Sequence, residues 1–261
     1  RNRNKNYRRL ERTKMKITAD YHTHTIYSHG KGTIRENVEA ARKKGLSEIA
    51  ICDHGPGHIF YGVRKGNLFK MRREIDKLNE EYSDIKILLG LEANVIGYDG
   101  YIDVDEDILE IIDILLLGFH YGIIPRGIKS MYYFYILNPI SKVLSLVRKR
   151  AVGLNTNAVI RAIEKYPIDV ITHPGSKARL DIEKLAKTAY EHSTALEINS
   201  HHGQLSIEGI EEALKTDVEF IINSDAHHPD DVGDFQMGIE RALKAKVPID
   251  RIRNAKDNME V

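Results

Sequence analysis

Histidine and acidic residues follow short apolar runs that are typical of buried strands. Seven such runs end at Tyr21, Cys52, Leu91, Phe119, Thr172, Asn199 and Ser224, and six of them are followed by the candidate metal ligands His22, His24, His29, His54, Glu92, His120, His173, Asp225 and His227. In a barrel of parallel strands the carboxyl ends of all strands lie on one face. Seven imidazoles and two carboxylates would meet there. This indicates a metal cluster, because a buried ionisable group is costly unless it is paired or metal-bound.

The segments between these runs have helical periodicity. Residues 34–44 follow Thr33, a suitable N-cap, and end at Gly45. Four more segments have apolar residues at spacings of three and four, namely residues 69–82, 182–192, 207–215 and 238–246. The order strand, loop, helix recurs about seven times and predicts an α/β fold with a parallel sheet. Candidate ligands at nearly every strand end favour a closed barrel over an open sheet.

Residues 121–153 interrupt this order with the aromatic run Met131-Tyr132-Tyr133-Phe134-Tyr135 and a basic run at 148–150. We expect a helical insertion on the face that carries the candidate ligands. One hypothesis is a lid that selects substrate. The favoured alternative is that its aromatic residues pack on the barrel or on another subunit.

Composition places the chain among ordinary globular proteins, with 261 residues, 42% hydrophobic and 30% charged. No apolar run is long enough to cross a bilayer and there is no secretory signal, so we expect a cytoplasmic protein with no membrane partner. The single cysteine, Cys52, excludes an internal disulfide framework. A homo-oligomer remains open.

Positive charge is concentrated in residues 1–14, which hold seven Lys or Arg and one Glu. Such an arm could bind nucleic acid or a membrane surface. The alternative that we favour is a disordered linker or extension without a catalytic role, and we regard a nucleic-acid partner as unsupported. Residues 15–261 are then expected to form a single barrel domain.

Taken in order, the candidate ligands and their neighbours resemble the signature of the PHP superfamily, the polymerase and histidinol phosphatase domain, over roughly residues 16–246. The resemblance implies a distorted (β/α)7 TIM-like barrel that holds three divalent metal ions. It assigns His22, His24, Glu92 and Asp225 to one ion, a bridging Glu92 with His120 and His173 to the second, and His29, His54 and His227 to the third. Imidazole and carboxylate ligands suit Zn, Mn or Fe.

The same resemblance implies a phosphoric ester hydrolase that uses a metal-bound hydroxide on a small phosphorylated substrate. Three divalent ions outweigh two carboxylates, so an anionic substrate is favoured. We expect catalytic roles for Glu92 and Asp225, and for His201 or His202 as proton donor. Basic residues in the loops after His54 and His173 are candidates for phosphate binding, namely Arg64, Lys65, Lys177 and Arg179. We also expect Asp20 and Asp53 to orient ligand imidazoles.

Three alternative functions remain open at this stage. The first is a phosphatase specific for histidinol phosphate. The second is a deaminase or amidase of the amidohydrolase type, which also begins with a His-x-His strand but bridges its metals with a lysine after the fourth strand, where this chain has His120. The third is a PHP module without catalysis that regulates a partner.

Overall fold

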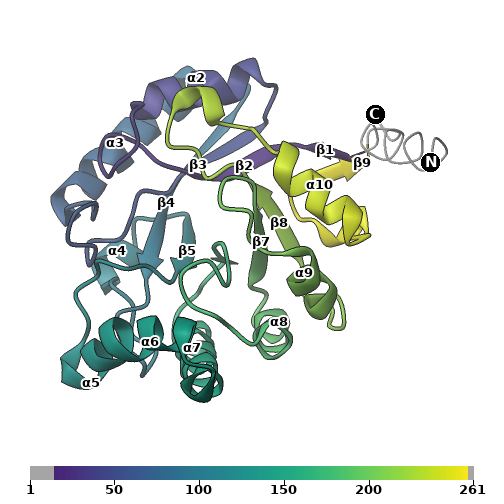
Figure 1. The fold of residues 1–261 in the computed structure, drawn as a ribbon. Helices are drawn as coiled ribbons and strands as arrows, with labels where there is room; N and C mark the ends of the chain where they lie inside the picture. The colour runs from purple at the N-terminus through teal and green to yellow at the C-terminus, as the bar shows by residue number, and fades with distance from the viewer. Residues whose placement is uncertain (1–14, 258–261) are drawn as a thin grey trace.

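A parallel sheet of seven strands forms the centre of the computed structural model, which describes residues 15–257 (Figure 1). The strands lie side by side in chain order: β2 (Ala19–Thr23), β3 (Glu48–Ile51), β4 (Lys86–Asn94), β5 (Ile114–Gly118), β6 (Val170–Ile171), β7 (Ala195–Asn199) and β8 (Phe220–Asn223). A parallel bridge between Thr23 and Ala226 joins the two outer strands. The sheet is therefore nearly closed, and the predicted distorted (β/α)7 barrel is confirmed.

A second, small sheet lies beside the barrel. Its strands are β1 (Met15–Ile17) and β9 (Ala255–Asp257), which pair antiparallel. Thr18 separates β1 from β2, and its N–H donates to the carbonyl of Asn254. The predicted basic extension, residues 1–14, lies outside the described residues, and the division into domains stays a prediction.

Helices cover the outside of the sheet (Figure 1). They are α2 (Ile34–Lys43), α3 (Lys65–Glu81), α4 (Glu106–Leu109), α5 (Gly127–Tyr132), the π-helix η1 (Tyr133–Leu137), α6 (Asn138–Val143), α7 (Ser145–Lys165), α8 (Ile182–Glu191), α9 (Ile207–Ala213) and α10 (Gln236–Lys244), with short 3-10 turns at Pro229–Asp231 and Ile249–Arg251. The predicted cap at Thr33 is present as a capping box with Glu36. Among the described residues, no helix is both long and apolar enough to cross a membrane.

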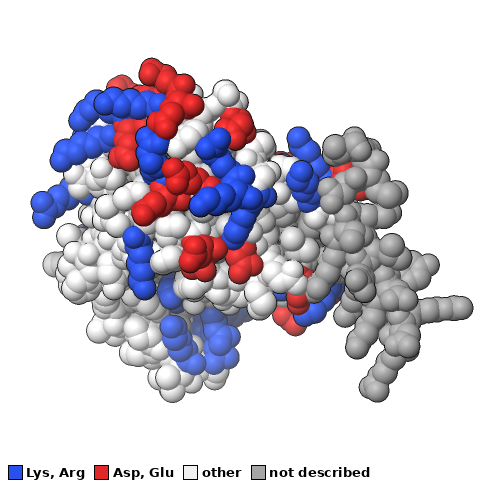
Figure 2. All heavy atoms as spheres, turned by 90° about the horizontal axis from the view of Figure 1, so that it is seen from above, with Lys and Arg blue, Asp and Glu red and all other residues white. Residues whose placement is uncertain are grey.

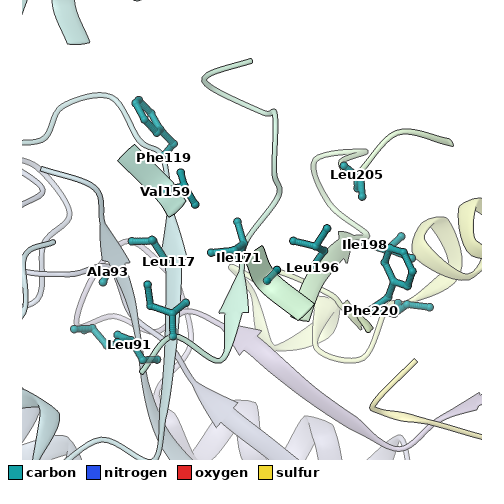
Figure 3. Packing of buried hydrophobic residues seen from close by; sticks show 14 of the residues in the cluster. Leu91, Ala93, Leu117, Phe119, Val159, Ile171, Leu196, Ile198, Leu205 and Phe220 are labelled. Atoms are coloured by element: carbon teal, nitrogen blue, oxygen red, sulfur yellow. The ribbon is translucent and has the colours of Figure 1, made fainter. Parts of the chain in front are cut away.

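Alternation along the strands separates the core from the site. In β4, Leu89, Leu91 and Ala93 belong to the apolar layer that also contains residues of the surrounding helices. Figure 3 shows Leu91 and Ala93 in this layer together with Val159 of α7. Leu88 belongs instead to a small cluster contributed by the strands alone. Since successive side chains point to opposite faces, Glu92 lies on the same interior face as Leu88. The strand thus buries apolar residues outward and directs an acid toward the barrel axis.

The connection from β5 to β6 contains the aromatic segment. Phe134 is fully buried, and its ring lies 4.9 Å from the ring of Phe119 and 5.1 Å from that of Tyr98. Tyr133 packs edge-on against Tyr98 at 4.8 Å. The helix α7 begins within the predicted insertion and continues through residue 153 to Lys165. The bounds of the insertion stay a prediction.

We expect Phe134→Ala to lower the free energy of unfolding by about 3–5 kcal/mol, because the substitution leaves a cavity among aromatic rings. Ile128→Ala is the matched control on the same helical segment, since Ile128 is 86% exposed. Its effect should stay within about 0.5 kcal/mol. Urea unfolding monitored by circular dichroism would measure both. Equal effects of the two substitutions would contradict the observed packing.

Candidate metal centre

All nine predicted ligands lie at the carboxyl ends of the barrel strands. The loops after β2, β3, β5, β6 and β8 supply most of them, and two stand within strands, His22 in β2 and Glu92 in β4. The apolar run of β4 had been taken to end at Leu91, whereas the strand continues to Asn94. Glu92 is consequently held by a strand rather than by a loop.

The carboxylate of Glu92 lies at the centre of this group and is fully buried. Its Oε1 lies 3.0 Å from Nε2 of His173 and 3.2 Å from Nε2 of His120. Its Oε2 lies 2.8 Å from Nδ1 of His54. Burial by itself raises the pKa of Glu92, but His120, His22 and His54 together hold it well below its usual range. Glu92 is therefore an anion that needs positive charge around it.

Asp225 forms a second anionic point. Its Oδ1 lies 3.2 Å from Nε2 of His24, 3.5 Å from Nε2 of His22 and 3.7 Å from Nδ1 of His227. Burial raises the pKa of Asp225, yet His22 and His24 hold it well below its usual range. Two ionised carboxylates thus lie among imidazoles on different strands.

The ligand atoms gather into three overlapping sets. These are His24 with His29, His54 and His227; His22 with His24 and Asp225; and His54 with Glu92 and His120. The second set contains three of the four residues that the resemblance assigns to one ion, and Glu92 is the fourth. His24 and His54 each occur in two sets, and the assignment of the ligands to individual ions stays a prediction.

The side chains fit divalent metal ions. Nε2 of His22 lies 3.2 Å from Nε2 of His24, and Nε2 of His120 lies 3.3 Å from Nε2 of His173. Two nitrogens bound to one tetrahedral zinc are about 3.3 Å apart. Four buried atoms of the predicted ligands lack a hydrogen-bond partner among the described residues: His24 Nδ1, His29 Nδ1, His54 Nδ1 and Glu92 Oε2. Two of these four atoms, His54 Nδ1 and Glu92 Oε2, lie only 2.8 Å apart, but they are not aligned for a hydrogen bond.

Glu197, which the sequence reasoning missed, orients two of the ligands. Its Oε1 accepts a hydrogen bond from Nδ1 of His22 at 2.8 Å, and its Oε2 accepts one from the backbone N–H of His173 at 2.7 Å. Because Nδ1 of His22 donates to Glu197, its Nε2 is free to face Asp225. The available signal was an acid inside the apolar strand β7, two residues before Asn199 on the same face.

Asn94, also missed, performs the same task for His120. Its Oδ1 accepts from Nδ1 of His120 at 2.7 Å, which leaves Nε2 of the imidazole directed at Glu92. Asp103 holds the amide of Asn94 by accepting from its Nδ2 at 2.5 Å. Asn94 lies two residues after Glu92 and therefore points to the same interior face.

Asp20 and Asp53 do not orient imidazoles, which corrects the sequence prediction. Asp53 accepts hydrogen bonds from the side chains of Thr25 and Ser28, and thereby holds the loop that carries His29. Asp20 accepts from Ser224 through both the N–H and the hydroxyl. Both acids fix the backbone of ligand-bearing loops.

Two predicted ligands have an uncommon backbone conformation. The φ angle is 29° at His173 and 56° at Asp225, in the left-handed region that non-glycine residues rarely adopt. Glu197 holds the N–H of His173, and Asn199 donates to Oδ2 of Asp225 at 3.0 Å. Such strain persists where surrounding contacts overdetermine it, and it is concentrated at functional sites.

A cavity of about 410 Å³ opens onto the ligands. Besides seven of the predicted ligands, it is lined by His58, Tyr61, Tyr121, Lys177, His201 and His202. Lys177 is the single predicted phosphate-binding cation in this lining. Lys65 forms ion pairs with Asp105 and Asp107 at 2.6 Å, and Arg64 and Arg179 are not among the residues that line the cavity. A role of these three residues in phosphate binding stays a prediction.

His58 and Tyr61 were not predicted to belong to the site. Their rings stack at 5.0 Å, and Tyr61 also stacks on His29 at 4.5 Å. Of the two predicted proton donors, His202 places Nε2 3.4 Å from Oδ2 of Asp225. Burial lowers the pKa of His202 to about 4, so it is neutral near pH 7. His201 lines the same cavity on the exposed side.

Comparison with known proteins agrees with this geometry. The PHP domain matches residues 20–223, and the chain belongs to this family. A protein of Shewanella piezotolerans is 31% identical over 92% of this chain and 90% of its own length, and one of Thermoanaerobacter sp. strain X514 is 32% identical over 92% and 91%. Both are named probable phosphatases, which supports the predicted class, a metal-dependent phosphoric ester hydrolase. The fold is similar to that of a histidinol phosphate phosphatase of Lactococcus lactis, with a TM-score of 0.56, 16% identity and coverage of 88% and 92%.

Glu197→Gln should weaken metal binding about 10- to 100-fold, the usual effect of removing a partner that orients a ligand. Glu197 uses one oxygen for His22 and the other for the backbone N–H of His173. A glutamine has a single side-chain oxygen, so it can accept only one of these two hydrogen bonds. Titration against a chromophoric chelator would measure the affinity. Glu80→Gln, an exposed change of the same kind on α3, should leave it unchanged. An unaltered affinity in Glu197→Gln would show that this carboxylate does not support the ligands.

Metal should be lost on acidification, because imidazoles bind metal in the neutral form. Burial lowers the pKa of His29 to about 3 and of His120 to about 4, so these two stay neutral at about pH 5. Burial also lowers the pKa of His22, but Asp225 and Glu197 raise it well above 6.5, and protons compete with metal there first. Metal binding stabilises the folded state, so that stabilisation is present at neutral pH and declines below it. Metal content after dialysis at about pH 8 and pH 5 would test this, and full retention at pH 5 would contradict it.

Proposed function

We propose that this protein hydrolyses a phosphate monoester at a site for three divalent metal ions, with Zn, Mn or Fe as the ions. The observation that carries the proposal is the convergence of the nine predicted ligands on one face of the barrel, where seven of them line a cavity that also contains Lys177. When bound, such ions activate water and neutralise phosphoryl oxygens.

Charge favours an anionic substrate. Although burial raises it, His22 lowers the pKa of Glu197, so Glu197 is a third buried anion beside Glu92 and Asp225. Three divalent ions would leave three positive charges on the site after these carboxylates are counted. A phosphate dianion supplies most of the missing negative charge.

The residues of the chain divide the remaining work. Glu92 would help to hold ions together with ligands from several strands, and Asp225 would hold an ion together with His22 and His24. Lys177 would bind a phosphate oxygen at the cavity wall. His201, which lines the cavity, would supply the proton that the leaving alkoxide needs, whereas His202 lies against Asp225.

The size of the cavity favours a small phosphorylated metabolite. A volume of about 410 Å³ is at the lower end of the range for sites that bind small molecules. The Lactococcus lactis protein is described with zinc, L-histidinol and phosphate, which supports this class of substrate and leaves the particular alcohol open.

Protein reconstituted with Zn or Mn should hydrolyse a generic aryl phosphate and one or more small phosphorylated metabolites. Removal of the metal by a chelator should abolish the activity, and Glu92→Gln should lower it about 100-fold or more, because even changes outside the ligand shell cost 10- to 100-fold. Glu80→Gln, exposed on α3, is the matched control and should retain full activity. Full phosphatase activity in protein shown to be free of metal would disprove the proposal.

A further inference from the structure

The outward face of the segment from α5 to α6 is apolar. The segments α5, η1 and α6 form a continuous helical run from Gly127 to Val143, with helical backbone angles at both junctions. Along it, residues at intervals of four are exposed and apolar in two columns: Ile128, Tyr132, Ile136, Ile140 and Leu144, and Met131, Tyr135, Pro139 and Val143. A helix on a protein surface normally presents polar residues to water. We call these nine residues the apolar face.

The π-helix η1 straightens these columns. In an α-helix, residues four apart drift around the axis, because a turn holds 3.6 residues. A π turn is wider, with i to i+5 hydrogen bonds, and it reduces that drift across Tyr133–Leu137. The opposite side of the same run buries Phe134 and Leu137 against the barrel. The helix is therefore firmly attached by one side while its apolar face remains uncovered.

The chain segment that carries the apolar face contains several cations and no acidic residue. Residues 114–163 contain no Asp or Glu. They contain the cations Arg126, Lys129, Lys142, Arg148, Lys149, Arg150 and Arg161. Arg126 is 4.0 Å from Asp99, and no other of the seven forms an ion pair within residues 15–257. On the face seen from above in Figure 2, Lys and Arg side chains lie next to Asp and Glu side chains. One such pair joins α2 to α3, where Arg35 contacts Glu81.

We propose that the apolar face and its cations dock onto an anionic lipid surface. Aliphatic and tyrosine side chains on one helix face, flanked by Lys and Arg, are the features of helices that lie in the interface of a membrane. The sequence had indicated no membrane partner, but that expectation rested on the absence of a spanning segment. Lying on a bilayer requires only exposed apolar area and positive charge.

Charge argues against a second copy of the chain as the occupant. Cations stand at both ends of the apolar face, Arg126 and Lys129 at one and Lys142 with residues 148–150 at the other. Whether two copies packed parallel or antiparallel, cations would meet cations, because a twofold interface brings the same surface together from both sides. Nucleic acid would leave the aliphatic side chains of Ile128 and Val143 without apolar contacts.

The apolar face begins beside the cavity. The hydroxyl of Tyr135 donates to the carbonyl of Ile123 at 2.5 Å, and Ile123 forms a β-bridge with His58 of the cavity wall. Lys142 lies over the ring of Tyr121, another wall residue, at 5.0 Å. Docking would thus bring a lipid surface next to the site, and this proposal does not depend on the substrate.

The experiment is sedimentation of the full chain with vesicles of phosphatidylcholine alone and of phosphatidylcholine with roughly 30% phosphatidylglycerol. We expect binding to the anionic vesicles, with weakening by salt. Lys149→Gln with Arg150→Gln should weaken it about 30-fold, because each cation near an anionic surface contributes about fivefold. Ile128→Ser with Val143→Ser should also weaken it. Their side chains are 86% and 82% exposed, so both changes leave the core intact.

Matched controls lie on other helices. Lys70→Gln with Lys77→Gln removes the same charge from the exposed side of α3, and Met237→Ser with Tyr190→Ser removes exposed apolar side chains from α10 and α8. All variants should keep the wild-type melting temperature, and the controls should bind like wild type.

The proposal is overturned if wild type fails to bind anionic vesicles at low salt, or if controls and apolar-face variants weaken binding equally. It is also overturned if sedimentation velocity shows an oligomer that the apolar-face variants dissociate, since a second copy then covers the face.

Discussion

The burial of the Glu92 carboxylate is the constraint on which the rest of the site depends. An ionised acid removed from water is costly unless cations or strong hydrogen bonds surround it. Here imidazoles from the ends of β2, β3, β5 and β6 approach its two oxygens. These strands are neighbours only because the parallel sheet curves toward closure. If the barrel opened at any of these strands, the Glu92 carboxylate would lose an imidazole that faces it. The site therefore requires the sheet to curve toward closure.

The same strands serve the core and the site through the alternation of their side chains. On β4, Leu91 and Ala93 pack among the helices while Glu92 and Asn94 face inward. On β7, Leu196 and Ile198 pack outward while Glu197 supports His22 and His173. A shift of one residue in the register of either strand would exchange the two faces. The apolar layer therefore sets the position of the ligands as much as the hydrogen bonds around them do.

The helical run between β5 and β6 has one side that packs on the barrel and another side that is exposed. Its inner side is fixed by Phe134 on Phe119, directly before the predicted ligand His120. Its outer side carries apolar residues that the fold does not use, in a region without acidic residues. Packing in the core explains the apolar residues of the inner side. The exposed apolar residues of the outer side do not contribute to the core, so they point to a partner of the protein.

The sequence by itself determined the fold class, the seven strands and the nine predicted ligands, because residue type and period along the chain are local properties. It could not identify Glu197 or Asn94 as supports, since which imidazole each one meets depends on the curvature that brings β4, β5 and β7 together. It also misjudged Asp20 and Asp53, each of which stands near a ligand in the chain but accepts hydrogen bonds from Ser224 or Thr25 instead of from an imidazole. Proximity along a loop does not fix the direction of a side chain. Only tertiary structure decided those directions, because hydrogen bonds and ion pairs form between atoms that packing, rather than sequence order, places within 3 to 4 Å.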